Sequence, residues 1–392
     1  MIKMIKYNVK KMVGETFLEI ADAIETGHFQ KKIRIGLTTL GSEHGIKNLV
    51  DGAELAAKDS KDFEIVLIGP KADTNLEIFE VDTEDEAYKK MEELLDQKYI
   101  QACVTMHYDF PVGVSTVGKI ITPGYGKEMF LATTTGTASI HRVEAMVKNA
   151  LYGIIIAKTM GLNDPTVGIL NLDGARQVER ALKELNCNGY KINFAESSRA
   201  DGGSAMRGND LLGGTPDVMV TDTLTGNILM KIFSSYTTGG NYEAAGFGYG
   251  PGVGENYDRI IMILSRASGK PVVANAIRYA VKLIQGNLSE VIKIEFANAR
   301  KAKLNDILES ITKGGSKGKK ENGELAAPPP KEVVTGEIFG IDIMELEDAV
   351  HELWKNGVYA ESGMGCTGPV VRVAEEKIDF ATKILEEAKY IS

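Results

Sequence analysis

The stretch that decides the fold is IRIGLTTLGSEHGIKNLVDGAELAAKDSKDFEIVLIGP, residues 33–70. Residues 33–37 are mostly apolar and predict a strand, and the glycines at 41 and 45 predict a turn. Residues 46–58 then have the apolar spacing of a helix, and residues 63–68 form a second apolar run. A strand, a helix and a strand of these lengths are typical of a parallel sheet flanked by helices. The sequence therefore predicts an α/β fold.

The same alternation continues along the chain. Further strands are expected at 102–106, 167–170, 191–194, 218–220 and 260–264. Further helices are expected at 85–97, 139–160, 175–185, 228–237 and 275–285. These elements assign residues 31–300 to one α/β body. An N-terminal helical segment, residues 1–30, precedes this body, with its helix at 12–27.

The composition changes after residue 300. Residues 312–323 are rich in lysine and glycine, and a proline run at 328–330 follows. This pattern predicts a linker over residues 301–337. The last segment, residues 338–392, is expected to hold a helix at 342–355, a cysteine loop, a strand at 370–373 and a helix at 374–389. Because this segment is small, it is expected to dock on the body.

The overall composition excludes several classes of protein. The 392 residues have a net charge of −9, which argues against a nucleic-acid binder because phosphate backbones require clustered lysine and arginine. No apolar run is long enough to cross a membrane, and the N-terminus lacks the apolar core of a secretory signal. Three cysteines form an odd and sparse set, which predicts a reducing compartment and a cytoplasmic location.

Residues 361–369, ESGMGCTGP, place one cysteine among glycines, small hydroxyls and a proline. Glycine and proline interrupt regular structure, so Cys366 is expected on an accessible, irregular loop. The backbone amides of Gly365, Thr367 and Gly368 would lie beside it as oxyanion donors. This setting suits a nucleophilic thiolate that is acylated and then released. The alternative is an incidental cysteine on a flexible loop.

Other cysteine and glycine patterns predict structure rather than chemistry. Cys103 lies in a short apolar strand and is expected to be buried. Cys187 is expected at the C-terminus of a helix, a position that does not activate a thiol. Residues 363–368 match G-x-G-x-x-G, but the strand and helix of a dinucleotide site do not surround them. Residues 246–254 have glycine at every second position and predict a mobile loop.

Three segments have the glycines, hydroxyls and helix starts of an anion cradle. Because the carboxyl ends of parallel strands share one edge of a sheet, the three are expected to form a phosphate or acyl-phosphate site. The candidate residues are Ser42, His44 and Gly45, then Thr134, Thr135 and Gly136, then Thr225, Gly226 and Asn227. Lys231 or Arg142 would supply the charge. Each segment alone is also compatible with an ordinary helix cap, and Lys231 with a solvated lysine.

No metal and no cofactor are expected. The five histidines are scattered along the chain, and neither the HExxH nor the CxxC spacing of metal sites occurs.

Three motifs carry a family resemblance. Residues 222–231, DTLTGNILMK, resemble the D-G-F-x-G-N-x-x-L-K segment of bacterial phosphate acyltransferases of phospholipid synthesis. Residues 40–45 resemble their M-G-G-D-H-G loop, and residues 275–280 resemble their N-A-I-x-x-A helix. This similarity implies a phosphate acyl/acetyltransferase-like, isopropylmalate-dehydrogenase-like fold with two subdomains and a cleft. The chain departs from the pattern at residues 265–268, which read SRAS where that family has H-G-S-S.

The full chain, including the linker and the cysteine segment, resembles the alpha-subunit family of component C of the glycine/sarcosine/betaine reductase complex. The resemblance implies a role in amino-acid fermentation and an acetyl thioester on Cys366. The acetyl group would pass to inorganic phosphate and give acetyl phosphate. The implied partners are a ketoacyl-synthase-like beta subunit and carboxymethylated selenoprotein A, with a homo-oligomeric assembly.

Two other functions remain open at this point. One is a phosphate acyltransferase that acts on acyl carrier protein at a membrane surface, which would need an amphipathic apolar hairpin that the sequence lacks. The other is a non-catalytic scaffold subunit, in which Cys366 is an exposed thiol without a reaction. No nucleic-acid or membrane partner is expected.

Overall fold

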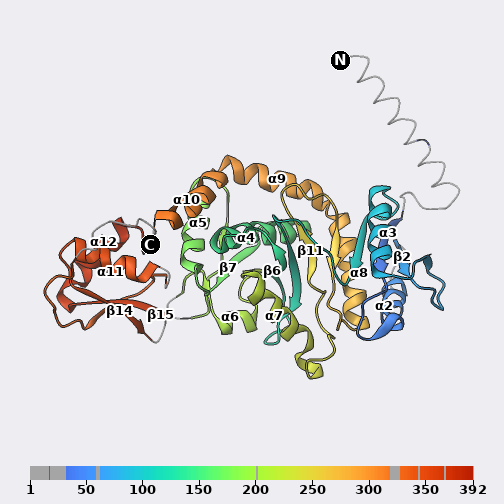
Figure 1. Cartoon of the computed structure of the whole chain (residues 1–392), viewed down its shortest axis with the longest axis horizontal. Helices are drawn as coiled ribbons and strands as arrows, with labels where there is room; N and C mark the ends of the chain where they lie inside the picture. Colours follow the sequence, from blue (N-terminus) through green and yellow to red (C-terminus); the bar gives the residue numbers. More distant parts are fainter. Residues whose placement is uncertain are drawn as a thin grey trace, which may run out of the picture.

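The structure is a computed structural model that describes residue 17 and residues 32–58, 62–199, 202–317, 327–342, 345–365 and 368–391. Within these residues the main body is built on a 12-stranded sheet with helices on both faces (Figure 1). A separate three-stranded sheet belongs to the C-terminal part. The helix expected at 12–27 lies outside the described residues apart from Phe17.

The body alternates strands and helices as expected. Its strands are β1 (Ile33–Thr38), β2 (Phe63–Gly69), β3 (Glu77–Glu80), β4 (Ala102–Thr105), β5 (Val114–Ile121), β6 (Glu128–Thr137), β7 (Thr166–Leu170), β8 (Asn193–Phe194), β9 (Ala205–Met206), β10 (Val218–Val220), β11 (Gly250–Val253) and β12 (Ile261–Ile263). Its helices are α2 (Gly45–Lys58), α3 (Glu84–Asp96), α4 (Arg142–Thr159), α5 (Ala175–Cys187), α6 (Gly208–Gly213), α7 (Thr223–Ser235), the 3-10 turn η1 (Tyr236–Thr238), α8 (Lys270–Gln285), α9 (Leu288–Lys301) and α10 (Leu304–Lys317).

The sheet joins two groups of parallel strands. Its order is β3-β2-β1-β4-β12-β11-β5-β6-β10-β7-β8, and β9 also pairs with β7. Strands β3, β2, β1, β4 and β12 pair in parallel, as do β6, β10, β7 and β8. Between the groups, β11 is antiparallel to both β12 and β5, and β5 is antiparallel to β6. The predicted α/β class is therefore confirmed, with a mostly parallel sheet.

Alternate residues of the strands pack into two cores, one on each face of the sheet. On β6, Phe130 and Ala132 belong to the core that also contains buried residues of α2, α4, α5, α8, α9 and α10. Met129 and Leu131 belong to the opposite core, which buries residues of α3, α6 and α7. Figure 1 shows α4 and α9 on one side of the sheet and α6 and α7 on the other.

The glycine-rich segment 246–254 is not a mobile loop. Its residues 250–253 form β11, and all four are buried in the middle of the sheet. A Cβ atom at Gly250 would lie 1.8 Å from the carbonyl oxygen of Val117, and one at Gly252 would lie 2.4 Å from the ring of Phe110. The glycines are needed because backbone and ring approach this strand too closely for a side chain.

Helix α10 corrects the start of the expected linker. The range 301–337 was expected to connect two parts, but residues 304–317 form a helix. Leu304 and Ile307 on this helix are buried in the core with α4 and α5. The helix forms because its apolar residues pack against the body. The content of lysine and glycine in this range does not indicate that packing.

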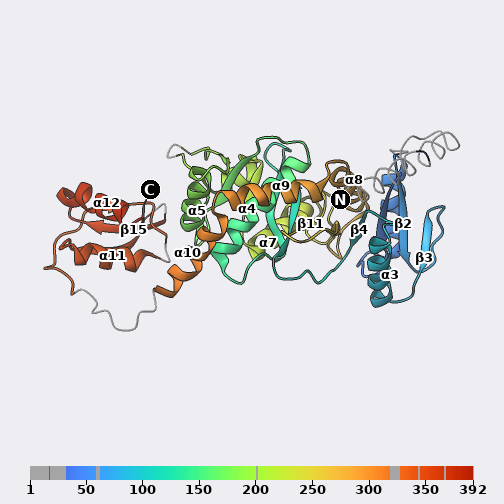
Figure 2. The same cartoon turned by 90° about the horizontal axis from the view of Figure 1, so that it is seen from above.

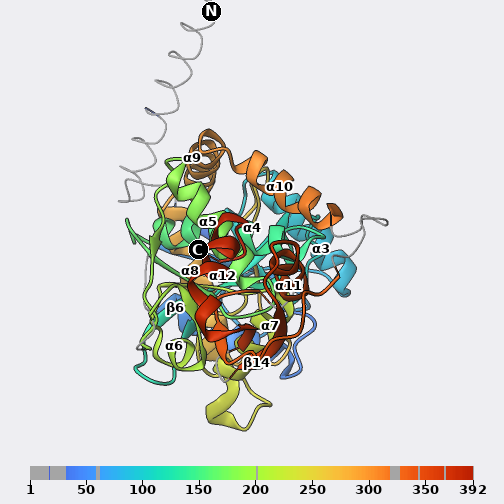
Figure 3. The same cartoon turned by 90° about the vertical axis from the view of Figure 1, so that its left-hand side faces the viewer.

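The C-terminal part has a hydrophobic core of its own. It contains β13 (Gly336–Ile338), α11 (Leu346–Lys355), β14 (Ala360–Gly365), β15 (Gly368–Val373), the 3-10 turn η3 (Glu375–Lys377) and α12 (Ile378–Glu387). Its strands pair antiparallel in the order β13-β15-β14, and α11 and α12 bury their apolar faces against this sheet. Figures 2 and 3 show this unit at one end of the molecule, next to α5 and α10.

The C-terminal unit touches the body through Arg180 on α5. The guanidinium of Arg180 donates to the backbone carbonyl of Tyr390 at 3.1 Å and pairs with the carboxylate of Glu345. The contact is polar, and the apolar side chains of the unit are buried in its own core.

Candidate active site

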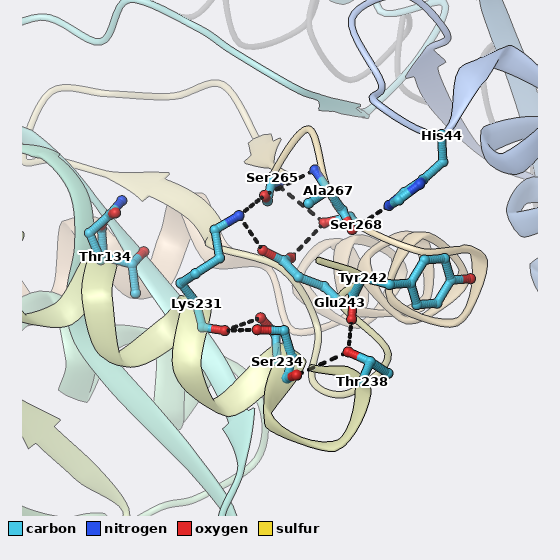
Figure 4. A network of polar contacts seen from close by, with 12 residues as sticks. His44, Thr134, Lys231, Ser234, Thr238, Tyr242, Glu243, Ser265, Ala267 and Ser268 are labelled. Atoms are coloured by element: carbon cyan, nitrogen blue, oxygen red, sulfur yellow. Dashed lines mark hydrogen bonds and ion pairs between the residues drawn. The ribbon is translucent and has the colours of Figure 1, made fainter. Parts of the chain in front are cut away.

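Lys231 lies at the centre of a polar cluster formed by segments that are distant in the sequence (Figure 4). Its Nζ donates to Ser265 Oγ at 2.7 Å and pairs with Glu243 Oε1 at 3.0 Å. Lys231 comes from α7, Glu243 from the segment between η1 and β11, and Ser265 from the loop that follows β12. We call Lys231, Glu243, Ser265, Ser268 and His44 the Lys231 cluster.

Glu243 is the buried anion of the Lys231 cluster, with no exposed surface. Its second oxygen, Oε2, accepts the hydroxyl of Ser268 at 2.9 Å, and Ser268 Oγ accepts the N–H of Ser265 at 3.1 Å. A buried carboxylate is tolerated only when such partners compensate it. The side chain of Lys231 is 42% exposed, and its contacts with the described residues use two of its three N–H donors. The remaining donor is free to bind a ligand.

His44 approaches the cluster from the other parallel group of strands. Its Nε2 lies 3.2 Å from the carbonyl oxygen of Ala267, so the proton on that nitrogen can be donated. Next to it, the N–H of Glu43 donates to the carbonyl of Arg266 at 2.8 Å. The two loops meet because β1 and β12 both pair in parallel with β4, which brings their carboxyl ends to one edge. The expected place of His44 at a shared edge agrees with this geometry.

Ser42 and Gly45 shape the loop that holds His44. The N–H of His44 donates to Ser42 Oγ at 3.2 Å, and the N–H of Gly45 donates to the carbonyl of Ser42. Gly45 has a φ of 77°, a left-handed conformation that favours glycine. Both residues lie at the start of α2, beside the Lys231 cluster. Their role in ligand binding stays a prediction.

The threonine segment expected to precede a helix is instead the end of β6. Thr134 is fully buried, and its hydroxyl donates to the carbonyl of Tyr249 at 2.6 Å. The N–H of Thr135 donates to Thr116 Oγ1, and the carbonyl of Gly136 accepts the hydroxyl of Thr223. These groups hold β6 against β5, β11 and α7 rather than presenting donors to solvent. Helix α4 begins only at Arg142.

The start of α7 is capped by a carboxylate of the chain itself. Asp222 accepts both the N–H of Thr225 at 2.9 Å and its hydroxyl at 3.0 Å, and Arg142 pairs with Asp222 at 2.8 Å. The side-chain amide of Asn227 donates to the carbonyl of Thr134. A phosphate expected at Thr225, Gly226 and Asn227 would therefore compete with Asp222 for these donors.

Gly226 allows α7 to touch the sheet. A Cβ atom at this position would lie 1.7 Å from the carbonyl oxygen of Thr133. Close packing of α7 on β6 explains the glycine at this position, and Lys231 follows about one and a half turns further along the same helix.

Cys366 and Thr367 lie outside the described residues, so their expected roles stay predictions. The residues on either side belong to strands, because β14 and β15 pair antiparallel up to Gly365 and Gly368. The expectation of an irregular loop over all of 361–369 is therefore wrong for the flanks. Figure 1 shows β14 and β15 at one end of the molecule and α2 and α8 towards the other.

The other cysteines occupy the expected environments. Cys103 on β4 is fully buried, and this burial raises the pKa of its thiol. Cys187 is exposed at the last residue of α5. Over the ranges that the structure describes, no group of three or more His, Cys, Asp or Glu side chains is arranged to hold a metal ion. In the same ranges no helix has the length and apolarity needed to cross a bilayer.

The sequence reasoning missed Glu243, Ser265 and Ser268 as site residues. Ser265 and Ser268 lie in the SRAS segment, which was noted only as a departure from the acyltransferase pattern. The replacement of H-G-S-S by SRAS directly after a strand is the signal in the sequence that could have identified these two serines. Glu243 follows no motif, and its role depends on the contact with Lys231 twelve residues earlier.

Comparisons with known proteins agree with the resemblance found in the sequence. The family model of the fatty acid synthesis proteins matches residues 33–372. "Glycine/sarcosine/betaine reductase complex component C subunit alpha" of Peptoclostridium acidaminophilum is 66% identical over 385 residues, which cover 98% of this chain and 100% of the relative. A phosphate acyltransferase of Geobacillus sp. (strain WCH70) is 26% identical over 244 residues, 51% of this chain and 70% of the relative.

Among solved structures, a branched-chain phosphotransacylase from Enterococcus faecalis V583 aligns with a TM-score of 0.46 at 16% identity, over 64% of this chain and 99% of that one. The near-complete match at 66% identity decides the family. The chain therefore belongs to the fatty acid synthesis protein family and, within it, to the alpha subunits of component C of the glycine/sarcosine/betaine reductase complex.

Proposed function

We propose that this protein is the acyltransferase subunit that forms acetyl phosphate in a glycine reductase system. Cys366 carries the acetyl group as a thioester, and inorganic phosphate bound at the Lys231 cluster accepts it. The single observation that supports a site at this cluster is the position of Lys231 Nζ, at the end of a partly exposed side chain, 2.7 Å from Ser265 Oγ and 3.0 Å from the buried carboxylate of Glu243. Family membership supports acyl transfer as the class of reaction.

The proposed step exchanges one acyl bond for another. A phosphate oxygen attacks the thioester carbonyl, a C–O bond forms, and the C–S bond breaks to release the Cys366 thiolate. No oxidant or reductant is needed. Phosphate is already an anion at neutral pH, so catalysis depends on positioning it and on donors for the oxygen of the tetrahedral intermediate. The backbone amides of Gly365, Thr367 and Gly368 are proposed as those donors.

The Lys231 cluster has groups that suit phosphate. Lys231 offers a positive charge and a donor, and Ser265 offers a hydroxyl next to it. His44 and the loop of Ser42 and Gly45 border the same edge of the sheet. Glu243 offsets the lysine charge, which would keep the site from binding phosphate so tightly that the product cannot leave.

The proposal requires the cysteine segment to approach the cluster. The C-terminal unit has its own core and is joined to α5 through Arg180, so it can be moved as one body. Nine residues, 318–326, separate the described end of α10 from the described start of this unit. A chain of that length spans at most about 30 Å. The ketoacyl-synthase-like beta subunit and carboxymethylated selenoprotein A are the proposed donors of the two-carbon unit, in the cytoplasm.

Replacement of the cysteine tests the covalent step. Arsenate-dependent breakdown of acetyl phosphate would be measured for Cys366→Ala and for the control Cys187→Ala, which removes an exposed thiol of α5. We expect loss of activity only in the first variant, together with loss of the acetyl mass adduct on the tail peptide. Full activity of Cys366→Ala would rule out the thioester.

Replacement of the lysine tests the phosphate site separately. Lys231→Met should raise the KM for phosphate at least tenfold while the acetyl adduct on Cys366 still forms. The control is Lys148→Met, which removes a lysine that pairs with Glu144 on α4. An unchanged KM in Lys231→Met would place the phosphate elsewhere without affecting the thioester.

A further inference from the structure

His107 and Asp109 form a polar pair that the proposed reaction leaves unused. His107 Nε2 lies 3.1 Å from Asp109 Oδ1, and the two side chains are 58% and 96% exposed. Tyr108 between them and Phe110 after them pack against the core that holds residues of α3 and α7. The segment after β4 therefore crosses the sheet on the face covered by α3 and α7, and its imidazole and carboxylate are accessible there.

His107 lies beyond its strand at the same level as Ser265 beyond the neighbouring one. β4 and β12 are parallel, with Thr105 opposite Ile263, and the N–H of Leu264 donates to the carbonyl of Thr105 at 2.8 Å. This register, continued by two residues, puts His107 opposite Ser265. The hydroxyl of Thr105 also donates to the carbonyl of His107 at 3.3 Å, so the chain is held close to the end of the strand.

The same edge of the sheet contains a topological switch point. From β1 the chain passes to β2 and β3 on one side and then to β4 on the other side, and the connecting helices α2 and α3 lie on opposite faces. Ligands of open α/β sheets bind outside the carboxyl ends of the strands at such a reversal. His44 follows β1 and contacts the carbonyl of Ala267 in the loop after β12. The loops after β1, β4 and β12 thus border one place.

Charged groups of neighbouring elements connect the pair to the loop after β12. Burial raises the pKa of the Tyr88 phenol on α3, and the carboxylate of Glu84 raises it further. Arg266, in the loop after β12, lowers the same pKa, and Asp109 raises it. Arg266 also pairs with Glu84 at 3.3 Å. From the neighbouring elements, Glu84, Tyr88 and Arg266 therefore face the pair.

We propose that His107 is the catalytic base and acid that moves the proton of the Cys366 thiol. The inference rests on the proposed function, because it assigns a further residue to the same reaction. When acetyl phosphate acetylates the protein, His107 Nδ1 takes the thiol proton and the sulfur attacks the acetyl carbonyl. A C–S bond forms, and the C–O bond to phosphate breaks. In the opposite direction phosphate attacks the thioester, and the imidazolium returns the proton to the departing thiolate.

The contact with Asp109 suits this role. Because Nε2 faces the carboxylate, Nδ1 is the nitrogen left to exchange a proton with the sulfur. A carboxylate fixes the tautomer and stabilises the imidazolium, which makes Asp109 a positioning residue. The partner of His44 is the neutral carbonyl of Ala267, which stabilises an imidazolium less than a charged acceptor does.

Rapid-quench measurement of the acetyl adduct on Cys366, after the full chain is mixed with acetyl phosphate, tests the proposal. His107→Gln should slow adduct formation at pH 7 at least about a hundredfold, the scale of a lost acid–base group, with little change in the acetyl phosphate concentration that gives half the maximal rate. Asp109→Asn should slow it less. The matched control is His141→Gln, at an exposed histidine just before α4, which should react at the wild-type rate. Equal melting temperatures would show that the variants fold.

The pH dependence separates proton transfer from a structural role. The wild-type rate should rise within the range of about pH 5–8 in which imidazole ordinarily loses its proton, because only the neutral ring accepts one. In His107→Gln the rise should move towards about pH 8.5, where a free thiol ionises. Added imidazole should restore part of the rate at pH 7 in His107→Gln but not in Cys366→Ala.

The outcomes distinguish this inference from the proposed function. If the wild type forms no adduct on Cys366, the thioester and the role of His107 are both wrong. If the adduct forms and His107→Gln reacts with the wild-type rate and pH dependence, the thioester stands and the role of His107 alone is wrong. A loss confined to His44→Gln would assign the proton transfer to His44 and overturn the inference in the same way.

Discussion

Asp210 gives the sharpest quantitative prediction, because every contact of its carboxylate is defined. Its Oδ1 accepts the N–H of Ser198 at 2.8 Å, the hydroxyl of Ser198 at 2.9 Å and the hydroxyl of Thr215 at 3.0 Å. Its Oδ2 accepts the hydroxyl of Ser197 at 2.8 Å and the N–H of Arg207 at 2.9 Å. The residue is fully buried, so these bonds join α6 to the loop after β8 without competition from water.

The pKa of Asp210 measures how strongly this site prefers the charged form. Burial alone would raise the pKa, but the bonds from the backbone amides of Ser198 and Arg207 and from the hydroxyls of Ser197 and Ser198 outweigh it and lower the pKa from 3.8 to about 2. At about 1.4 kcal/mol per pKa unit, the ionised form stabilises the fold by about 2.5 kcal/mol. Because the folded pKa is the lower one, this contribution is complete above pH 5 and is lost as the pH falls towards 2.

Urea unfolding of the wild type and of Asp210→Asn tests this account. At pH 7 the variant should lose at least about 2 kcal/mol of unfolding free energy, because an amide group turned towards N–H and O–H donors leaves a buried donor unpaired. At pH 3 the difference should be smaller by about 1 kcal/mol, since the wild type has lost that part of its advantage. The control Asp164→Asn, at an exposed partner of Lys191, should change stability by less than about 0.5 kcal/mol at pH 7.

A pH-independent difference, or a variant as stable as the wild type, would refute the account of Asp210. In the first case the hydrogen bonds would not favour the ionised carboxylate. In the second, the contacts would contribute nothing beyond those an amide can make.

Two further substitutions test the packing of α7 and the attachment of the C-terminal unit. Gly226→Ala should destabilise the chain by at least about 2 kcal/mol because a methyl group would overlap a backbone carbonyl, whereas Gly208→Ala, which meets nothing within 4 Å, should be neutral; equal melting temperatures would contradict the close approach. Arg180→Ala should increase the radius of gyration measured by X-ray scattering, while Arg176→Ala, which removes a pair within α5, should not. An unchanged radius would mean that other contacts hold the unit in place.

The fold class followed from the sequence because strand and helix periods are local. The run from 33 to 70 gives β1, α2 and β2 within a few residues of the expected limits. The segment 246–254 was misassigned because glycine signals freedom when read alone, and only the distance to Val117 and Phe110 reveals that it packs in a sheet. Close packing between segments that are distant in the sequence cannot be recognised from the residues of one segment alone.

The candidate site was predictable only where a motif marked it. His44 and Lys231 lie in segments that match acyltransferase motifs, and they approach the same loop. Hydroxyl-rich segments were less reliable, because threonine serves equally well as a ligand donor and as an internal hydrogen-bond partner. Thr134 is an internal partner. Glu243 could be identified as a site residue only from its contact with Lys231, because nothing in the neighbouring sequence indicates that this glutamate is buried.

The short strand β11 has a mechanical consequence. It is bonded by two residue pairs to β12 and by two to β5, and among the described strands only the edge strands β8 and β9 are paired as sparsely, so β11 forms a narrow seam in the middle of the wide sheet. Bending would be easiest along this line, where the fewest backbone bonds resist it. The Lys231–Ser265 bond bridges the seam, because α7 packs on β6 while Ser265 follows β12. A ligand that takes the place of Lys231 Nζ or Ser265 Oγ in this bond would itself connect the two sides of the sheet.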